Sequence, residues 1–79
     1  MENLEKRVID VLSEVKPNIT ENLDRRFVEE GILDSLDMMN LIMKLEGEFE
    51  IMIDPEDVIS EYFESVEAIA GLVERCGKR

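Results

Sequence analysis

The chain has 79 residues and a formal net charge of −11, from 20 aspartates and glutamates against 9 lysines and arginines. This length has room for a single domain, and because apolar residues make up 44% of it, we expect a folded core rather than disorder. The charge argues against nucleic acid or an anionic membrane as a partner and favours a basic protein surface. Histidine is absent, so the commonest general base and metal ligand are missing. We therefore expect neither catalytic residues nor a metal site.

Cellular location can be inferred only from what the sequence lacks. Cys76 is the only cysteine, which rules out an internal disulfide and suits a reducing compartment. No signal peptide is apparent, and no apolar run approaches the length of a membrane-spanning helix. We expect a cytoplasmic monomer that does not insert into a membrane.

The first predicted element is a helix over about residues 3–16, where apolar residues recur at helical spacing. Pro17 ends it, because proline breaks a helix interior and restricts the preceding residue. A long connection follows over residues 17–34. Its apolar side chains, which predict an ordered segment packed on the core, are Ile19, Leu23, Phe27, Ile32 and Leu33.

Three further helices are predicted, over about residues 35–50, 55–61 and 65–76. Asp54-Pro55 begins the short one as N-cap and first-turn proline, and Ser65 caps the last. The predicted fold is all-α: a small four-helix bundle with a long loop between its first two helices and a short third helix.

The helix over residues 35–50 carries two apolar stripes. The broader stripe, which can supply the core, contains Met38, Leu41, Ile42, Leu45 and Phe49. The second stripe, on nearly the opposite side, contains Leu36, Met39 and Met43. A surface helix normally has one stripe, so the second indicates an exposed docking patch, for which flexible methionine is well suited. The alternative is a helix buried on both sides.

Ser35 lies where the loop gives way to this helix, directly after Asp34. Either residue can cap a helix. If Asp34 is the cap, the Ser35 hydroxyl points outward in the first turn, at the positive helix end that favours phosphate.

Residues 27–51, FVEEGILDSLDMMNLIMKLEGEFEI, resemble the central stretch of acyl carrier proteins. Residues 4–12 resemble that family's first helix, and residues 65–74 resemble its last. In the family, the serine of Asp-Ser-Leu receives 4′-phosphopantetheine from coenzyme A through a phosphopantetheinyl transferase. The resemblance implies Ser35 as the attachment point, with Asp34, Leu36 and Asp37 contacting the cofactor and the transferase.

The resemblance also implies two surfaces around the serine. Partner docking falls on Leu36, Asp37, Met39, Met43 and Glu46. Cargo lining between the second and third helices falls on Met38, Ile42, Ile53, Val58, Ile59 and Phe63. For each of these lining residues, plain core packing is the alternative.

The implied function is a carrier, not an enzyme, that shuttles acyl thioesters in a fatty-acid, polyketide or specialised lipid pathway. Its partners would be the transferase, an acyl- or aminoacyl-loading ligase, and downstream synthases or transferases with basic surfaces. The lead-in Gly31-Ile32-Leu33 looks more like that of D-alanyl carriers, so an aminoacyl carrier loaded by an adenylating ligase stays open. A third alternative is an unmodified acidic helical adaptor.

Overall fold

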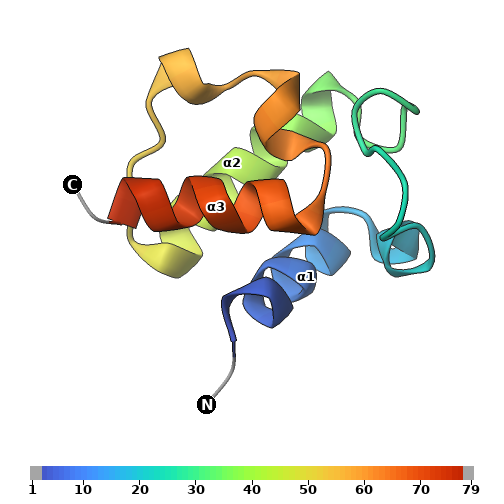
Figure 1. Cartoon of the computed structure of the whole chain (residues 1–79), viewed down its shortest axis with the longest axis horizontal. Coiled ribbons are helices and arrows are strands. Elements are labelled where there is room, and N and C mark those ends of the chain that lie inside the picture. Colours follow the sequence, from blue (N-terminus) through green and yellow to red (C-terminus); the bar gives the residue numbers. More distant parts are fainter. Residues whose placement is uncertain (1–2, 78–79) are drawn as a thin grey trace.

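The computed structural model describes residues 3–77, and all of its regular elements within that range are helical (Figure 1). The α-helices are α1 (Leu4–Val15), α2 (Ser35–Phe49) and α3 (Val66–Gly77). The 3-10 turns are η1 (Pro17–Glu21), η2 (Pro55–Asp57) and η3 (Ser60–Phe63). The predicted all-α class is confirmed.

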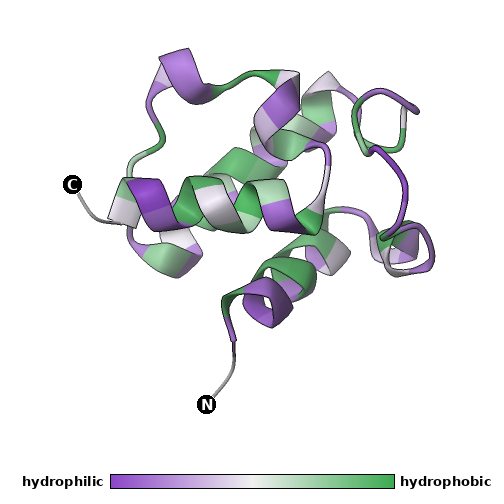
Figure 2. Ribbon diagram, viewed as in Figure 1, coloured by the Kyte–Doolittle hydropathy of each residue, from purple (hydrophilic) through white to green (hydrophobic). Residues whose placement is uncertain are grey.

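The core lies where the three α-helices meet. In the view of Figure 1, α3 crosses in front of α2, and α1 lies below and contacts both. α2 is mostly hydrophobic where it passes behind α3, whereas the η2 turn is hydrophilic (Figure 2). The largest fully buried side chains are Phe27, Phe63, Leu12, Ile19, Leu33, Leu41, Leu45, Ile69, Leu72 and Val8. Burial of each such apolar side chain contributes about 1.5–3 kcal/mol, so this cluster dominates the folding free energy.

α1 begins and ends as its sequence predicts. The Asn3 Oδ1 atom accepts a hydrogen bond of 2.7 Å from the Lys6 N–H and caps the first turn. At the other end, the Lys16 N–H donates to the Leu12 carbonyl at 2.8 Å, and Pro17 then starts η1. These contacts fix the backbone of Lys16 at the C-terminal end of α1.

The long connection is pinned to the core at separate points, as predicted. Ile19, Phe27 and Leu33 are almost completely buried. Within the connection, the Leu33 N–H donates to the Phe27 carbonyl at 2.8 Å. Gly31 lies between these residues with a φ of 75°, a conformation that glycine adopts without steric cost. The loop is thus an ordered wall rather than a flexible linker.

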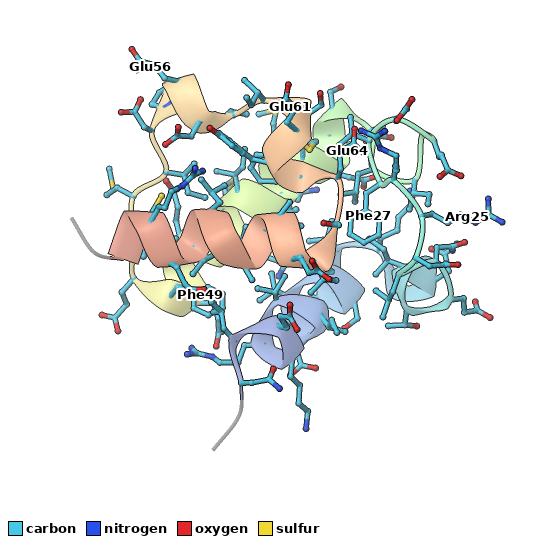
Figure 3. The ribbon with its side chains drawn as sticks, in the orientation of Figure 1. Arg25, Phe27, Phe49, Glu56, Glu61 and Glu64 are labelled. Atoms are coloured by element: carbon cyan, nitrogen blue, oxygen red, sulfur yellow. The ribbon has the colours of Figure 1, made fainter. Side chains whose placement is uncertain are left out.

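Glu64, just before α3, holds this wall. Its Oε1 atom accepts hydrogen bonds from the Val28 N–H at 2.9 Å and the Glu29 N–H at 3.1 Å. Its own carbonyl accepts from the Phe27 N–H at 3.0 Å. Phe27 and Glu64 lie side by side, while Arg25 is directed outward (Figure 3). Consecutive backbone groups of the loop are therefore satisfied by one glutamate far away in sequence.

The short third helix expected over residues 55–61 is not a continuous helix. The structure has the separate turns η2 and η3 instead, with Val58 and Ile59 between them. Ile59 is extended, with φ −127° and ψ 151°. β-Branched side chains lose rotamer freedom in a helix, which slightly disfavours a helix through Val58 and Ile59. The side chain of Phe63, which follows them, is buried in the core. The cap residue Asp54 is as predicted, since its side chain accepts from the Glu56 N–H.

α2 ends at Phe49, and its C-cap residue Glu50 adopts the left-handed conformation with a φ of 53°. Arg7 of α1 reaches this end: its Nη2 atom lies 3.4 Å from both the carbonyl and the carboxylate of Glu48. The Arg7 guanidinium also stacks 4.5 Å from the centre of the Phe49 ring. A cation at a helix C-terminus complements the dipole, so Arg7 ties α2 to α1 at this end.

The helices described over residues 3–77 are all too short or too polar to cross a lipid bilayer.

Replacing Glu64 with alanine should lower the free energy of unfolding by about 1–3 kcal/mol, because the half-buried Val28 N–H loses its acceptor. Glu64→Gln keeps an oxygen acceptor and should lose clearly less. Urea denaturation followed by circular dichroism measures both. Glu61→Ala is the matched control, since it removes the same charge from an exposed neighbour. Equal stability of Glu64→Ala and Glu61→Ala would contradict the role of Glu64.

Candidate functional site

The N-terminus of α2 is closed by a reciprocal pair of aspartates. The Asp34 Oδ1 atom accepts from the Asp37 N–H at 2.8 Å, and the Asp37 Oδ2 atom accepts from the Asp34 N–H at 3.2 Å. This is a capping box, with aspartate where serine and glutamate are more usual. Asp34 is thus the cap, as expected, and Ser35 is left in the first turn, exposed to solvent.

The Ser35 hydroxyl and the first two N–H groups of α2 are free of hydrogen bonds to other residues in the range 3–77. The structure records none for the Ser35 hydroxyl, the Ser35 N–H or the Leu36 N–H within that range. Unsatisfied N–H groups at a helix start carry the positive end of the dipole and attract phosphate. An exposed hydroxyl next to free N–H groups fits a phosphodiester joined through Ser35.

Asp37 is tied to α1 as well as to the loop. Its Oδ2 atom accepts from the Lys16 Nζ atom at 3.0 Å, and the Asp37 side chain is only 14% exposed. Burial on its own raises the pKa of the Asp37 carboxyl. The hydrogen bonds from Lys16 and the Asp34 backbone, together with the Lys16 charge, outweigh burial and hold this pKa below its ordinary value. Asp37 is therefore a charged, fixed part of the site.

An apolar groove of about 390 Å³ opens beside Ser35. Its polar lining residues are Asp34 and Ser35. Its apolar lining residues are Val28, Leu33, Met38, Met39, Ile42 and Val58. One wall comes from α2, a second from the loop held by Glu64, and Val58 closes the groove from the segment between η2 and η3. A group attached to Ser35 thus has an apolar surface within immediate reach.

The structure separates the proposed cargo-lining residues into different environments. Met38, Ile42 and Val58 line the groove. Ile53 and Phe63 do not, because they are buried in the core, with Phe63 fully inaccessible. Ile59 is 42% exposed and lies outside the groove lining. Core packing, the alternative considered for each residue, therefore describes Ile53 and Phe63.

The second stripe of α2 is solvent-exposed. Leu36, Met39 and Met43 are 66%, 62% and 68% exposed. Burial of α2 on both sides is thus wrong for this structure. Large apolar side chains in a row on one helix face form a surface suited to contact with another protein.

Glu46, expected in the docking set, is engaged within the chain. Its Oε2 atom accepts from the Ile53 N–H at 2.9 Å, and its carbonyl accepts from the Ile51 N–H at 3.2 Å. Glu46 thus fixes the turn of the chain after α2.

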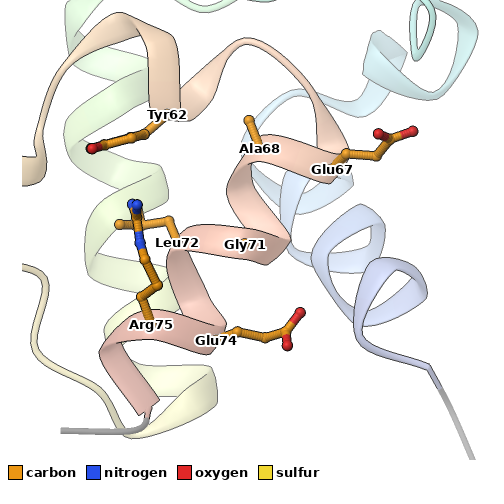
Figure 4. Close-up of a pocket in the computed structure, with 7 residues that line it drawn as sticks. All are labelled: Tyr62, Glu67, Ala68, Gly71, Leu72, Glu74 and Arg75. Carbon is orange, nitrogen blue, oxygen red and sulfur yellow. The ribbon is translucent and has the colours of Figure 1, made fainter.

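A second hollow, of about 380 Å³, lies on α3 and η3 rather than beside Ser35 (Figure 4). Two residues that line this hollow contact each other: the Arg75 guanidinium stacks over the Tyr62 ring, 4.4 Å from the ring centre. Ala68 and Gly71 also line the hollow. None of its lining residues belongs to α2, so it is separate from the groove.

Sequence reasoning missed Lys16, Val28 and Leu33 as parts of this site. Lys16 is 21 residues from Asp37, and no local pattern links a lysine after one helix to an aspartate in the next. Val28 and Leu33 were recognisable only as apolar residues of the loop. Their place beside Ser35 follows from long-range packing, for which a single sequence carries no signal.

Comparison with known proteins agrees with this geometry. Residues 4–73 match the family described as "Phosphopantetheine attachment site". The D-alanyl carrier protein of Lactococcus lactis subsp. lactis (strain IL1403) is 33% identical over 73 residues, covering 90% of this chain and 92% of the relative. The D-alanyl carrier protein of Bacillus cereus (strain B4264) is 39% identical over 64 residues, covering 78% and 76%.

The family match over residues 4–73 places the chain in the class of carrier proteins, and the small all-helical fold agrees with that class. The chain belongs to the phosphopantetheine-attachment family, in its acyl carrier branch and similar to D-alanyl carriers. It is accordingly a non-catalytic carrier with covalently bound 4′-phosphopantetheine, whose thiol supplies the thioester linkage. The family expected from the sequence, and its cofactor, are confirmed.

The lowered pKa of Asp37 predicts a pH-dependent contribution to stability. Because the folded-state pKa lies below the unfolded value of about 3.9, the contribution is fully present above that value and is lost as pH falls through the folded pKa. The stability difference between wild type and Asp37→Asn should therefore shrink below about pH 4.

Urea denaturation of the unloaded protein at a series of pH values measures this difference. Lys16→Met removes the cation that holds the pKa down, so replacing Asp37 in that background should have a smaller effect on the pH profile. A wild-type to Asp37→Asn difference that is the same from about pH 6 to about pH 2.5 would contradict the assignment.

Proposed function

We propose that Ser35 is the residue that carries the phosphopantetheine arm and that the arm carries D-alanine. The observation that supports Ser35 most directly is that another residue, Asp34, caps the start of α2. Asp34 accepts the capping hydrogen bond, so the Ser35 hydroxyl stays exposed beside free N–H groups. Chemistry performed on this hydroxyl by a partner enzyme needs no base from the chain itself.

Other hydroxyls of the described chain are less suitable. The Ser13 and Thr20 hydroxyls donate to backbone carbonyls of their own helical turns. The Ser65 Oγ atom accepts from the Ala68 N–H at 3.0 Å and caps α3. Ser60 is exposed at the start of η3, a turn too short to present an organised helix terminus.

D-alanine as cargo is supported by the relatives. Those compared above are named D-alanyl carrier proteins, and they align over most of their own length. In the proposed loading step, an adenylating ligase lets the carboxylate of D-alanine attack the α-phosphorus of ATP, which forms D-alanyl-AMP and releases pyrophosphate. The arm's thiol then attacks the carbonyl carbon, the thioester forms and AMP leaves.

An acyl group of a lipid pathway is the second candidate cargo, and the groove favours it. Met38, Ile42 and Val58 offer apolar surface directly beside Ser35. A volume of about 390 Å³ is within the range of small-molecule sites. The ammonium group of D-alanine gains nothing from such a surface, whereas a short acyl chain would.

The exposed stripe of α2 is proposed as the docking surface for the transferase and the ligase. Leu36, Met39 and Met43 provide apolar contact next to Ser35, and Asp37 lies at its edge. No lysine or arginine occurs between Leu45 and Glu74, so the C-terminal half presents carboxylates to an approaching partner. A partner with a basic rim around an apolar patch fits this surface.

Attachment at Ser35 is tested by intact mass measurement after incubation with coenzyme A and a broad-specificity phosphopantetheinyl transferase. Wild type should gain the mass of one phosphopantetheine, and Ser35→Ala should gain none. Ser60→Ala is the matched control and should load like wild type, because it also removes an exposed hydroxyl. Loading of Ser35→Ala would move the attachment point elsewhere.

Cargo is tested by offering the loaded protein D-alanine or short fatty acids, each with ATP and the corresponding adenylating ligase. The D-alanyl thioester should accumulate, visible as a mass gain that hydroxylamine removes. Ser35→Ala should stay unmodified with either cargo. Efficient loading with a fatty acid and none with D-alanine would replace the first proposal with the second.

A further inference from the structure

The start of α2 has to accommodate more negative charge than its dipole can compensate. The Asp37 carboxylate folds back over the helix end to accept from the Asp34 N–H. A phosphodiester on Ser35, which the proposed function requires, adds a second anion in the same first turn. The helix terminus supplies a charge of only about half a unit. One further positive charge is therefore needed at this end.

Lys16 supplies that charge from another helix. Its Nζ atom lies 3.0 Å from the same Oδ2 atom of Asp37 that accepts the Asp34 N–H. The backbone of Lys16 is fixed, because its N–H donates to Leu12 and its carbonyl accepts from Ile19 at 2.9 Å. With its side chain 35% exposed, Lys16 is screened less than a fully exposed lysine.

We propose that Lys16 is a positioning residue for prosthetic-group attachment: it compensates the charge of Asp37, so that the start of α2 accepts the phosphodiester on Ser35. This inference rests on the proposed attachment at Ser35. Lys16 acts through Asp37 and is not itself assigned a contact with the arm. Two carboxylates and a phosphate at one helix end are tolerated because Asp34 lies exposed at the rim while Asp37 is paired.

The experiment compares Lys16→Met with Lys44→Met. Lys44 also forms an ion pair between α1 and α2, 3.3 Å from Glu14, and its loss changes the net charge equally. Nine residues along α2, or about 14 Å, separate Lys44 from Ser35. Loading rates with coenzyme A and transferase are measured at low ionic strength, where charge effects are least screened.

Lys16→Met should lower kcat/KM for loading about fivefold or more, through an uncompensated charge at the helix terminus, whereas Lys44→Met should stay near wild type. Lys16→Arg should retain loading. The double variant Lys16→Met/Asp37→Asn should load faster than Lys16→Met and match Asp37→Asn alone, because the uncompensated carboxylate charge is gone. A merely structural tie is broken in Lys16→Met and in the double variant alike, so a double variant that loads no faster than Lys16→Met would contradict the proposal.

A thermal readout is independent of the transferase. Attaching the arm should lower Tm by about 4 °C more in Lys16→Met than in Lys44→Met, and the double variant should lose this extra shift. If wild type does not load at Ser35, the proposed function fails. If wild type loads and Lys16→Met matches Lys44→Met in both rate and Tm shift, only the role of Lys16 fails.

Discussion

The carboxylate of Glu64 is the contact on which the arrangement of the site depends. It satisfies the Val28 and Glu29 N–H groups, and the Glu64 carbonyl satisfies Phe27. A loop between helices has no ladder of its own to hold its backbone, so it needs acceptors from elsewhere in the chain. With this loop fixed, Leu33 and Val28 face the start of α2 and form one wall of the groove. The distant Glu64 thus helps to hold the loop wall of the apolar groove beside Ser35.

The sequence predicts the parts of the molecule that depend on local chemistry. Helical periodicity and caps place α1, α2 and α3, and Asp34 is the cap because aspartate before a helix accepts from its N–H groups. The segment after α2 is harder to predict, because Asp54-Pro55 is a local signal for a helix start, whereas the interruption at Val58 and Ile59 has no equally specific local signal. Long-range partners left no local pattern. Lys16 beside Asp37 and Glu64 beside Val28 are consequences of the fold, and only coordinates reveal them.

α2 contributes to both the apolar groove and the exposed stripe. Both of its ends contact α1 or the residue that directly follows α1. Lys16 holds its first turn through Asp37, and Arg7 holds its last through Glu48 and Phe49. The exposed Arg7–Glu48 pair adds little stability, and the Lys16–Asp37 pair is partly buried. The rotation of α2 about its axis is set mainly by burial of Leu41 and Leu45, and the ties at its two ends agree with that rotation. That rotation decides which stripe is buried against the core and which remains open to partners.

The groove therefore combines firmly held walls with a less firmly held one. α2 and the loop are fixed at several points by buried side chains and hydrogen bonds. Val58 comes from the segment between η2 and η3, and residues 54–62 contain no buried side chain. Segments with few buried apolar contacts open at low free-energy cost. Val58 can therefore move away from the groove without unfolding of the three-helix core. The groove beside Ser35 is therefore bounded by two fixed elements and, at Val58, by a segment without buried side chains.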